Sequence, residues 1–405
     1  MAEWTSRKLG ELIAIKHGFA FKGEYFGEDE SGPILVTPGN FSIGGGFRKA
    51  KIKSYSGPIL EEFVLAPGDL VVTMTDLSKA ADTLGYPALI PERLTYLHNQ
   101  RIGKIEILNA RQLDKGFLHY ALRVGDYRRH VVNGATGSTV KHTSPTRICE
   151  YVISLPSLPE QRVIASLLGA LDDKIAVNER IAITYERLLQ CRYAELGLAD
   201  EPNPERAVSV TRFVTFNPKV AKPSADDPIY VEMAALQTDR FSIPAWTRRA
   251  PKSGPRFMNG DTLLARITPC LENGKTGYVD FMGNGEVGLG STEFIVMRSL
   301  PGVPSELSYF LARDGRFREH AIRNMVGTSG RQRVGAGDAA NYQVNRPDSN
   351  ALVGFGREAS AAFGHIKSLQ AENRTLATLR DTLLPQLMSG RLRVKDAEKI
   401  VEDAT

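Results

Sequence analysis

Residues 159–196 read PEQRVIASLLGALDDKIAVNERIAITYERLLQCRYAEL, and the rest of the chain can be organised around this segment. Pro159 suits a first helical turn because its missing N–H would have no partner there, and Glu160 meets the positive end of the helix dipole. Core-type positions return at alternating steps of four and three, as in a coiled-coil seam. These positions are Ile164, Leu168, Leu171, Ile175, Asn178, Ala182, Tyr185, Leu189, Arg192 and Leu196. We predict one helix that spans about 55 Å and ends near Gly197.

A second segment near the C-terminus carries the same seam, shifted by 191 residues. Its positions are Phe355, Ala359, Ala362, Ile366, Leu369, Asn373, Leu376, Arg380, Leu383 and Leu387. Pro385 is expected to kink the last turns of this helix. The equal register favours antiparallel pairing of the two helices, with one globule at each end of the coiled coil. Two unrelated amphipathic helices on separate cores are the alternative.

The remaining sequence repeats at nearly the same offset, which indicates an internal duplication. The matching segments are 33–36 (PILV) with 228–231 (PIYV), 68–72 (GDLVV) with 260–264 (GDTLL), 99–102 (NQRI) with 291–294 (STEF) in pattern only, and 151–156 (YVISLP) with 342–347 (YQVNRP). Each match is weak by itself, but the order and the offset are shared. The repeat unit is a globule of about 155 residues followed by a helical segment of about 40 residues.

Within each globule, short β-branched or aliphatic runs alternate with glycine and proline, which indicates mixed sheet with long loops. Helical spacing of apolar residues predicts helices over residues 115–133 and 305–325. The expected fold is α+β, with two globules of mixed sheet and helices, two long helices in an antiparallel coiled coil, and a pseudo-two-fold internal repeat. The predicted divisions are a first globule over 1–158, a central helix over 159–199, a second globule over 200–354, a C-terminal helix over 355–392 and a tail over 393–405.

Composition describes an ordinary folded protein with a mild basic excess. A chain of 405 residues exceeds the size at which a single core usually stops growing, so more than one domain is expected. The net charge of +5 and the isoelectric point near 9.0 suggest an anionic partner. The three cysteines are too far apart for a zinc knuckle, and no signal peptide or membrane-spanning run is recognisable. We expect a cytoplasmic protein.

No catalytic constellation emerges from the residues. Residues 283–288 have the spacing G-x-G-x-x-G, but no long helix opens there, so a dinucleotide site is not expected. Residues 274–276 (GKT) resemble the end of a phosphate loop, yet Pro269 stands where its first glycine should be. Histidines such as His320 have no partner at metal-ligand spacing, which favours structural or surface roles. The sequence favours a chain that is not an enzyme, holds no metal and binds no cofactor itself.

Basic and hydroxyl side chains near glycine-containing loops are the candidates for binding nucleic acid. Arginine pairs with phosphates and can donate two hydrogen bonds to guanine, whereas loop lysines most simply contact phosphate. The candidates are Lys16, Lys22, Arg128, Arg129, Thr139, Lys141, His142, Arg266, Lys275, Arg316, Thr328, Ser329, Arg331 and Arg333. A solvated helix face is the alternative for the arginines. Turn capping is the alternative for Thr139, Thr328 and Ser329.

The helical segments contain short sequence motifs that resemble those of a known family, the specificity subunits of Type I restriction-modification systems. Residues 155–162 (LPSLPEQR) and 171–175 (LDDKI) are similar to the entry of that family's central helix. Residues 376–390 (LATLRDTLLPQLMSG) are similar to its C-terminal helix. Residues 15–22 and 265–275 look like stretches common in the family's target recognition domains. The likeness extends over the whole chain.

The resemblance implies that the two globules are target recognition domains. Each would read one half of an asymmetric, bipartite sequence in double-stranded DNA, with half-site centres roughly 34 to 36 Å apart. The chain would position two adenine N6-methyltransferase (modification) subunits, and restriction subunits would join for cleavage. S-adenosylmethionine, ATP and Mg²⁺ would be used by those partners. A coiled-coil DNA-binding regulator without such partners, and a stand-alone DNA-modifying enzyme, are the alternatives.

Overall fold

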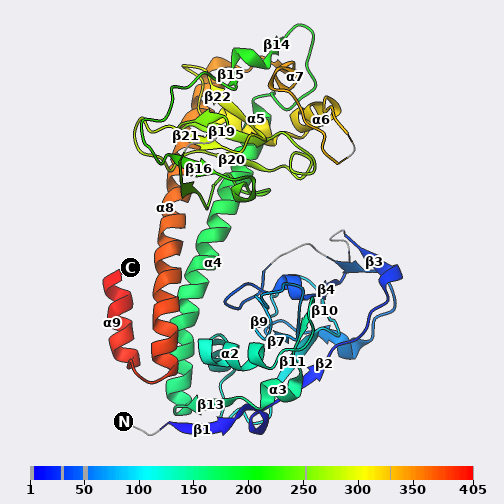
Figure 1. The fold of residues 1–405 in the computed structure, drawn as a ribbon, viewed down its shortest axis with the longest axis vertical. Helices are drawn as coiled ribbons and strands as arrows, with labels where there is room; N and C mark the ends of the chain where they lie inside the picture. The colour runs from blue at the N-terminus through cyan, green and yellow to red at the C-terminus, as the bar shows by residue number, and fades with distance from the viewer. Residues whose placement is uncertain (1–3, 29–31, 49–52, 251–252, 329, 405) are drawn as a thin grey trace. The chain divides into compact units, whose positions relative to one another are not determined.

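The computed structural model describes residues 4–28, 32–48, 53–250, 253–328 and 330–404. The chain divides into two compact units (Figure 1). Unit 1 comprises residues 1–176 and 372–405, and unit 2 comprises residues 177–371. Each unit therefore contains one globule together with part of each long helix.

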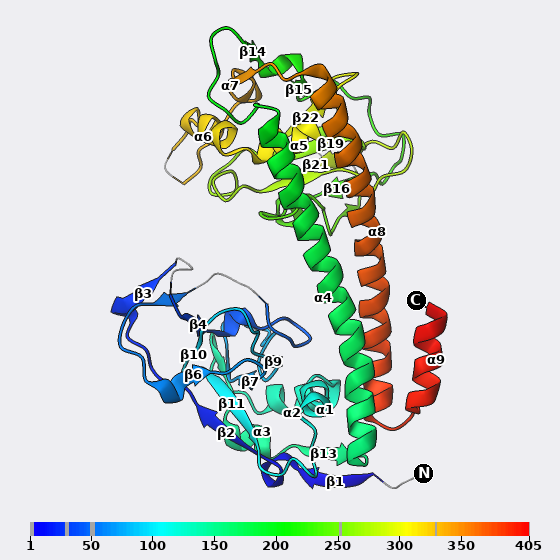
Figure 2. The same cartoon turned by 180° about the vertical axis from the view of Figure 1, so that it is seen from behind.

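The two long helices are α4 (Leu158–Glu195) and α8 (Ser349–Met388), of 38 and 40 residues. Their contacts have antiparallel order within each unit, and Figures 1 and 2 both draw them side by side. The contacts are Asp172 with Arg380 and Lys174 with Glu372 in unit 1, and Tyr185 with His365 and Arg192 with Glu358 in unit 2. In every pair the α8 number falls as the α4 number rises, so the predicted antiparallel coiled coil is confirmed.

The start of α8 differs from the predicted one. The helix begins at Ser349 rather than at residue 355. Asp348 accepts hydrogen bonds from the backbone N–H groups of Asn350 and Ala351, both at 2.9 Å, and so caps the first turn. The predicted end of α4 was accurate, because Gly197 has a φ of 74° in the left-handed region where helices commonly stop.

Unit 1 is built on two main sheets. Its strands are β1 (Thr5–Lys8), β2 (Ile13–His17), β3 (Phe26–Gly27), β4 (Ile34–Val36), β5 (Ser54–Tyr55), β6 (Val64–Leu65), β7 (Leu70–Thr73), β8 (Thr75–Asp76), β9 (Pro87–Leu89), β10 (Tyr96–His98), β11 (Ile102–Ile107), β12 (Lys141–His142) and β13 (Val152–Leu155). One sheet has the order β2-β11-β7-β9 and is antiparallel throughout. The other has the order β3-β5-β4-β10-β6, with β4 and β10 parallel. Strand β1 pairs with β13 and so closes the globule just before α4.

Unit 2 repeats this topology. Its strands are β14 (Ala207–Ser209), β15 (Val214–Phe216), β16 (Ile229–Val231), β17 (Thr247–Arg248), β18 (Arg256–Phe257), β19 (Asp261–Ala265), β20 (Thr276–Tyr278), β21 (Gly288–Gly290), β22 (Phe294–Ser299) and β23 (Gln343–Asn345). The sheet orders are β15-β22-β19-β20 and β17-β16-β21-β18, with β16 and β21 parallel and β14 paired to β23. The strands matched by the repeated sequence words take equivalent places, which confirms the duplication.

Each helix predicted inside a globule is in fact a pair of shorter helices. They are α1 (Lys115–Ala121) and α2 (Gly125–Asn133) in unit 1, and α5 (Leu307–Arg313) and α6 (Gly315–Arg323) in unit 2. The breaks lie at Val124 and Asp314, whose backbones are extended. Asp314 also caps α6 by accepting a hydrogen bond from the backbone N–H of Phe317. Apolar periodicity continues across such a break, so it did not reveal the division.

Shorter helices complete the structure. They are α3 (Pro145–Cys149), α7 (Ala336–Ala340), α9 (Val394–Ala404) and the 3-10 helices η1 (Leu9–Glu11), η2 (Gly23–Tyr25), η3 (Pro38–Asn40), η4 (Glu61–Phe63), η5 (Val210–Arg212) and η6 (Met233–Ala235). Residues 393–405, predicted as a tail, contain α9, and its Ala397 is fully buried in the core of unit 1.

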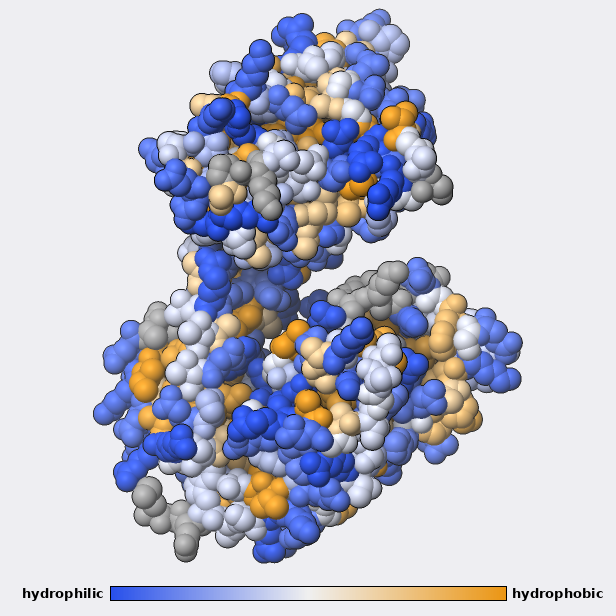
Figure 3. Space-filling model, in the orientation of Figure 1, coloured by the Kyte–Doolittle hydropathy of each residue, from blue (hydrophilic) through white to orange (hydrophobic). Residues whose placement is uncertain are grey.

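Each globule shares its core with the long helices. In unit 1, Phe117 of α1 belongs to one buried cluster with Leu168 of α4 and Leu376 of α8. In unit 2, Phe310 of α5 belongs to one cluster with Leu189 of α4. A buried leucine or phenylalanine contributes about 1.5 to 3 kcal/mol, so these clusters hold the globules to the helices. Hydrophilic residues predominate on the face of the molecule drawn in Figure 3.

Candidate nucleic-acid interface

Two loops lie side by side in unit 1. Strand β8 (Thr75–Asp76) pairs antiparallel with β12 (Lys141–His142). Residues 77–85, which follow β8, therefore lie beside the turn of residues 136–142. That turn is closed by two backbone hydrogen bonds between Thr136 and His142, at 2.9 and 3.0 Å. We call residues 77–85 and 136–142 the paired loops of unit 1.

Buried polar contacts hold residues 77–85 in place. The carboxylate of Asp76, only 4% exposed, accepts from the backbone N–H of Ser78 at 2.6 Å and from the Thr83 hydroxyl at 2.8 Å. Burial opposes ionisation of Asp76, yet these hydrogen bonds together bring its pKa below the ordinary value. The Leu77 side chain is 62% exposed on this loop. The loop is thus preorganised and exposes the apolar Leu77 side chain directly after β8.

Arg128, one of the predicted DNA contacts, takes part in this support. Its guanidinium lies over the Tyr86 ring at 4.0 Å, and its Nη2 donates to the Ala81 carbonyl oxygen at 2.7 Å. Ala81 has a positive φ of 56°, a strained conformation that such a contact helps to maintain. The observed contacts of Arg128 therefore support the loop from within.

Unit 2 has an equivalent pair of loops, residues 267–275 and 326–333. Val326 and Arg333 exchange two backbone hydrogen bonds, each at 2.9 Å. The backbone N–H of Thr268 donates to the Gln332 carbonyl at 3.1 Å, and the Thr268 hydroxyl accepts from the Gln332 backbone N–H at 3.1 Å. We call residues 267–275 and 326–333 the paired loops of unit 2.

A histidine makes the same contact in both repeats, between helices α2 and α3 in unit 1 and between helices α6 and α7 in unit 2. His130 bonds through Nε2 to the Arg147 carbonyl oxygen at 2.8 Å, and its ring lies 5.5 Å from that of Tyr151. His320 bonds through Nε2 to the Asp338 carbonyl oxygen at 2.9 Å, and its ring lies 5.1 Å from that of Tyr342. The sequence analysis did not single out His130. The signal was available, because the two histidines are 190 residues apart, close to the offset of the repeat.

Several predicted DNA contacts come together on the paired loops. In unit 1 these are Thr139, which is exposed, and Lys141, which is half-buried on β12. In unit 2 they are Thr328 and Arg331, both exposed. Ser329, also predicted, lies outside the described residues. A cation and a hydroxyl therefore share each pair of loops.

Besides Lys275, two other predicted contacts on these loops are engaged within the protein. His142 Nδ1 lies 3.1 Å from the Thr75 hydroxyl. Arg333 donates from Nε and Nη2 to the two carboxylate oxygens of Glu293, at 2.9 and 2.8 Å. Those hydrogen bonds hold the pKa of the Glu293 carboxyl below its usual value. His142 thus ties its loop to β8, and Arg333 ties its loop to the turn that precedes β22.

The other predicted cations have partners in their own surroundings. The contacts are Lys16 with Glu106 at 2.7 Å, Lys22 with Glu24 at 3.8 Å, Arg129 with Asp126, Lys275 with the Met233 carbonyl at 3.0 Å, and Arg316 with Glu201 at 3.8 Å. Lys16 and Lys22 belong to the β2 and η2 regions and not to the paired loops. Arg266, at the end of β19, is half-buried next to residues 326–333, since its carbonyl accepts from the Val334 backbone N–H at 3.0 Å.

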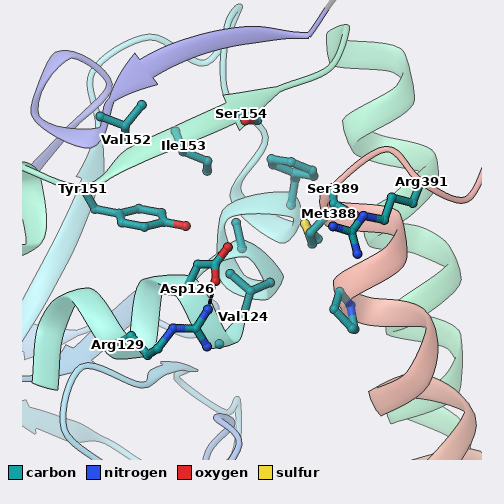
Figure 4. A pocket seen from close by; sticks show the side chains of 14 residues that line it. Val124, Asp126, Arg129, Tyr151, Val152, Ile153, Ser154, Met388, Ser389 and Arg391 are labelled. Carbon is teal, nitrogen blue, oxygen red and sulfur yellow. Dashed lines mark hydrogen bonds and ion pairs between the residues drawn. The ribbon is translucent and has the colours of Figure 1, made fainter.

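Unit 1 contains a pocket of about 630 Å³ (Figure 4). It lies between the start of α2, strand β13 and the end of α8. Among its described lining residues the only carboxylate is Asp126, which is paired with Arg129. Across the described part of the chain, no group of three or more histidine, cysteine, aspartate or glutamate side chains could hold a metal ion. The described helices also include none that is long and apolar enough to cross a membrane.

Comparison with known sequences identifies the relatives of this chain. Residues 1–187 match the family model described as Type I restriction modification DNA specificity domain. The chain is 30% identical to the Type I restriction enzyme EcoBI specificity subunit of Escherichia coli, over 46% of this chain and 37% of that protein. It is 27% identical to the EcoEI specificity subunit of Escherichia coli, over 48% of this chain and 34% of that protein. The alignments thus span little more than a third of either relative.

Comparison with solved structures supports the fold over nearly the whole chain. The S subunit of a Type I restriction-modification system from M. genitalium matches with a TM-score of 0.58 at 15% sequence identity. That match covers 95% of this chain and 96% of the other. The match shows that this chain shares the fold of that protein.

Proposed function

From the match of residues 1–187 to the specificity-domain model and the similarity to curated specificity subunits, we propose that this chain is a Type I restriction-modification specificity subunit that reads a bipartite sequence in double-stranded DNA. The observation that carries this proposal is the paired loops. Both repeats build them from equivalent segments joined by backbone hydrogen bonds, yet the loops carry different basic side chains, Lys141 in one and Arg331 in the other. A repeated scaffold with unlike tips suits the recognition of two unlike half-sites.

The chemistry of the loops suits duplex DNA. The major groove admits a two-stranded β-ribbon, and β8 and β12 of unit 1 form such a two-stranded pair. Arginine donates two hydrogen bonds to guanine, whereas lysine and threonine can contact base edges or phosphates. Apolar side chains such as Leu77 can contact the thymine methyl group. Each pair of loops would then specify one half-site, and their difference would make the whole sequence asymmetric.

We further propose that the chain acts without catalytic residues of its own, in the cytoplasm, as the guide of other subunits. It would position two adenine N6-methyltransferase subunits on the recognised DNA, and restriction subunits where these are present. S-adenosylmethionine would be used by the methyltransferases, and ATP with Mg²⁺ by the restriction subunits. No cofactor would bind to this chain.

Sequencing of base modifications in genomic DNA tests the proposal. One strain carries this chain with the methyltransferase encoded beside it, and a matched strain lacks only this chain. We expect N6-methyladenine in one asymmetric motif made of two separated parts, and loss of that methylation in the second strain. Identical methylation in both strains would contradict the guide function and favour a DNA-binding regulator. Methylation by the purified chain alone would instead indicate an enzyme.

A further inference from the structure

A basic pocket of about 700 Å³ lies beside the paired loops of unit 2. It is formed by the turn after β15 (residues 217–220), by residues 254–256, by Arg266 and by residues from 292 to 296 of the β22 region. Its titratable side chains are Lys219, Arg256 and Arg266, and its described lining includes no aspartate or glutamate. Three cations around one hollow create a strongly positive local potential.

The turn that carries Lys219 is clamped to β22. Asn217 donates its backbone N–H to the Val296 carbonyl at 2.7 Å and accepts from the Val296 N–H through Oδ1 at 2.9 Å. Asn217 has a positive φ of 51°, which asparagine tolerates better than most residues. Lys219 itself is exposed. Arg256 supports the same turn by donating from Nη1 to the Val220 carbonyl at 2.8 Å.

Arg266 connects the pocket to the paired loops. Its backbone donates to the Glu293 carbonyl and accepts from the Val334 N–H, both at 3.0 Å. Its side-chain Nε is buried, and it has no hydrogen-bond partner among the described residues. A buried donor without an acceptor is destabilising, and the oxygen of an anion would satisfy it. The carboxylate of Glu293, which also attracts Arg266, already accepts hydrogen bonds from Arg333.

We propose that this pocket binds a phosphate group of the DNA backbone, next to the bases that face the paired loops of unit 2. This inference rests on the proposed function and adds the place where unit 2 holds the sugar-phosphate chain. Contacts to phosphate set the register of a protein on the duplex but do not read the sequence. The pocket therefore contributes affinity and orientation, whereas the loops contribute specificity.

Substitution of Lys219 tests the inference with little risk to folding, because this side chain is exposed. The full chain, purified with its methyltransferase subunits, is titrated with a duplex that contains its motif and with a scrambled duplex, over a range of salt concentrations. Lys219→Ala is expected to weaken binding to both duplexes by the same factor and to reduce the salt slope by about one. Lys222→Ala, in an exposed residue three positions away that does not line the pocket, is the matched control.

Each outcome decides a separate point. Suppose that Lys219→Ala leaves the affinity and the salt slope unchanged, while the complex without the substitution prefers its motif. The proposed phosphate site is then wrong, but the proposed function stands. If Lys222→Ala lowers the affinity for DNA as much as Lys219→Ala does, the effect comes from general surface charge, and the proposed phosphate site is wrong. Inorganic phosphate is titrated in parallel at constant ionic strength. If Lys219→Ala abolishes saturable binding of inorganic phosphate but leaves DNA binding unchanged, the pocket binds the free anion and the proposed contact with the DNA backbone is wrong. If the complex without any substitution binds its motif no better than the scrambled duplex, the proposed function itself is refuted.

Discussion

At the residue scale, Asp172 joins the first globule to both long helices. Its carboxylate accepts from the Tyr120 hydroxyl at 2.8 Å, from Arg123 at 2.9 Å and from Arg380 at 2.5 Å. Burial disfavours its charge, but the two guanidinium groups hold the pKa of Asp172 below its usual value. We expect Asp172→Asn to lower the free energy of unfolding by about 3 kcal/mol, because Arg123 would be left buried without its counter-ion. Urea unfolding measures this, and an equal loss in exposed Asp173→Asn would contradict it.

Because the carboxyl of Glu186 in α4 is buried, we expect the stability of unit 2 to depend on pH. Burial raises the pKa of its carboxyl to about 7, although hydrogen bonds from the Phe241 N–H and the Tyr309 hydroxyl oppose this shift. The folded state holds the proton more tightly than the unfolded state, so stability falls as pH rises from about 4.5 to about 7 and then levels. Glu186→Gln should raise the free energy of unfolding by about 3 kcal/mol at pH 8 and by under about 1 kcal/mol at pH 5. An equal gain at both pH values in urea unfolding would refute this, and exposed Glu195→Gln is the control.

At the scale of elements, the paired loops of unit 1 should control one half of the recognised motif. We expect Lys141→Ala combined with Thr139→Ala to relax base preference in that half by about 1 to 3 kcal/mol, which is roughly 5- to 150-fold. The other half should keep its sequence, because its loops are unaltered. Sequencing of N6-methyladenine in a strain with the variant measures both halves at once. Arg111→Ala, in an exposed residue of unit 1 that is not among the candidate DNA contacts, serves as control. Relaxation in both halves would refute the assignment.

Helix bounds and strand pairs could be predicted from the sequence, whereas side-chain contacts between distant segments could not. The bounds of α4 were predictable because Pro159 and Gly197 mark them locally. The strand pairs shared by the two repeats were predictable from the repeated sequence motifs. The anchoring roles of His142 and Arg333 were not predictable, because the side chains they contact are 67 and 40 residues away in sequence. A basic side chain on a loop looks the same in a sequence whether it faces DNA or a buried neighbour.

At the scale of the whole molecule, the same topology is attached to the long helices by different chemistry. In unit 1 the attachment includes the ionic cluster around Asp172, one turn of α4 beyond Leu168. In unit 2 the attachment includes Phe363 of α8, whose ring stacks on Phe241 at 4.0 Å and contacts Tyr309 at 5.9 Å. Asp172 and Phe363 are 191 residues apart and so occupy equivalent positions in the repeat. The duplicated scaffold has therefore diverged even where it holds the globules, while its strand order has been kept.

This duplication predicts that recognition by the two units is energetically independent. Lys141 and Arg331 lie on separate compact units. Substitutions at distant sites without shared partners usually combine additively, to within about 0.5 kcal/mol. We therefore expect the factors by which Lys141→Ala and Arg331→Ala each weaken binding to the motif duplex to multiply in the double variant. Affinities of the four complexes at one salt concentration form the double-mutant cycle. A coupling energy well above about 0.5 kcal/mol would mean that one half-site is read only after the other is engaged, and would contradict independent reading.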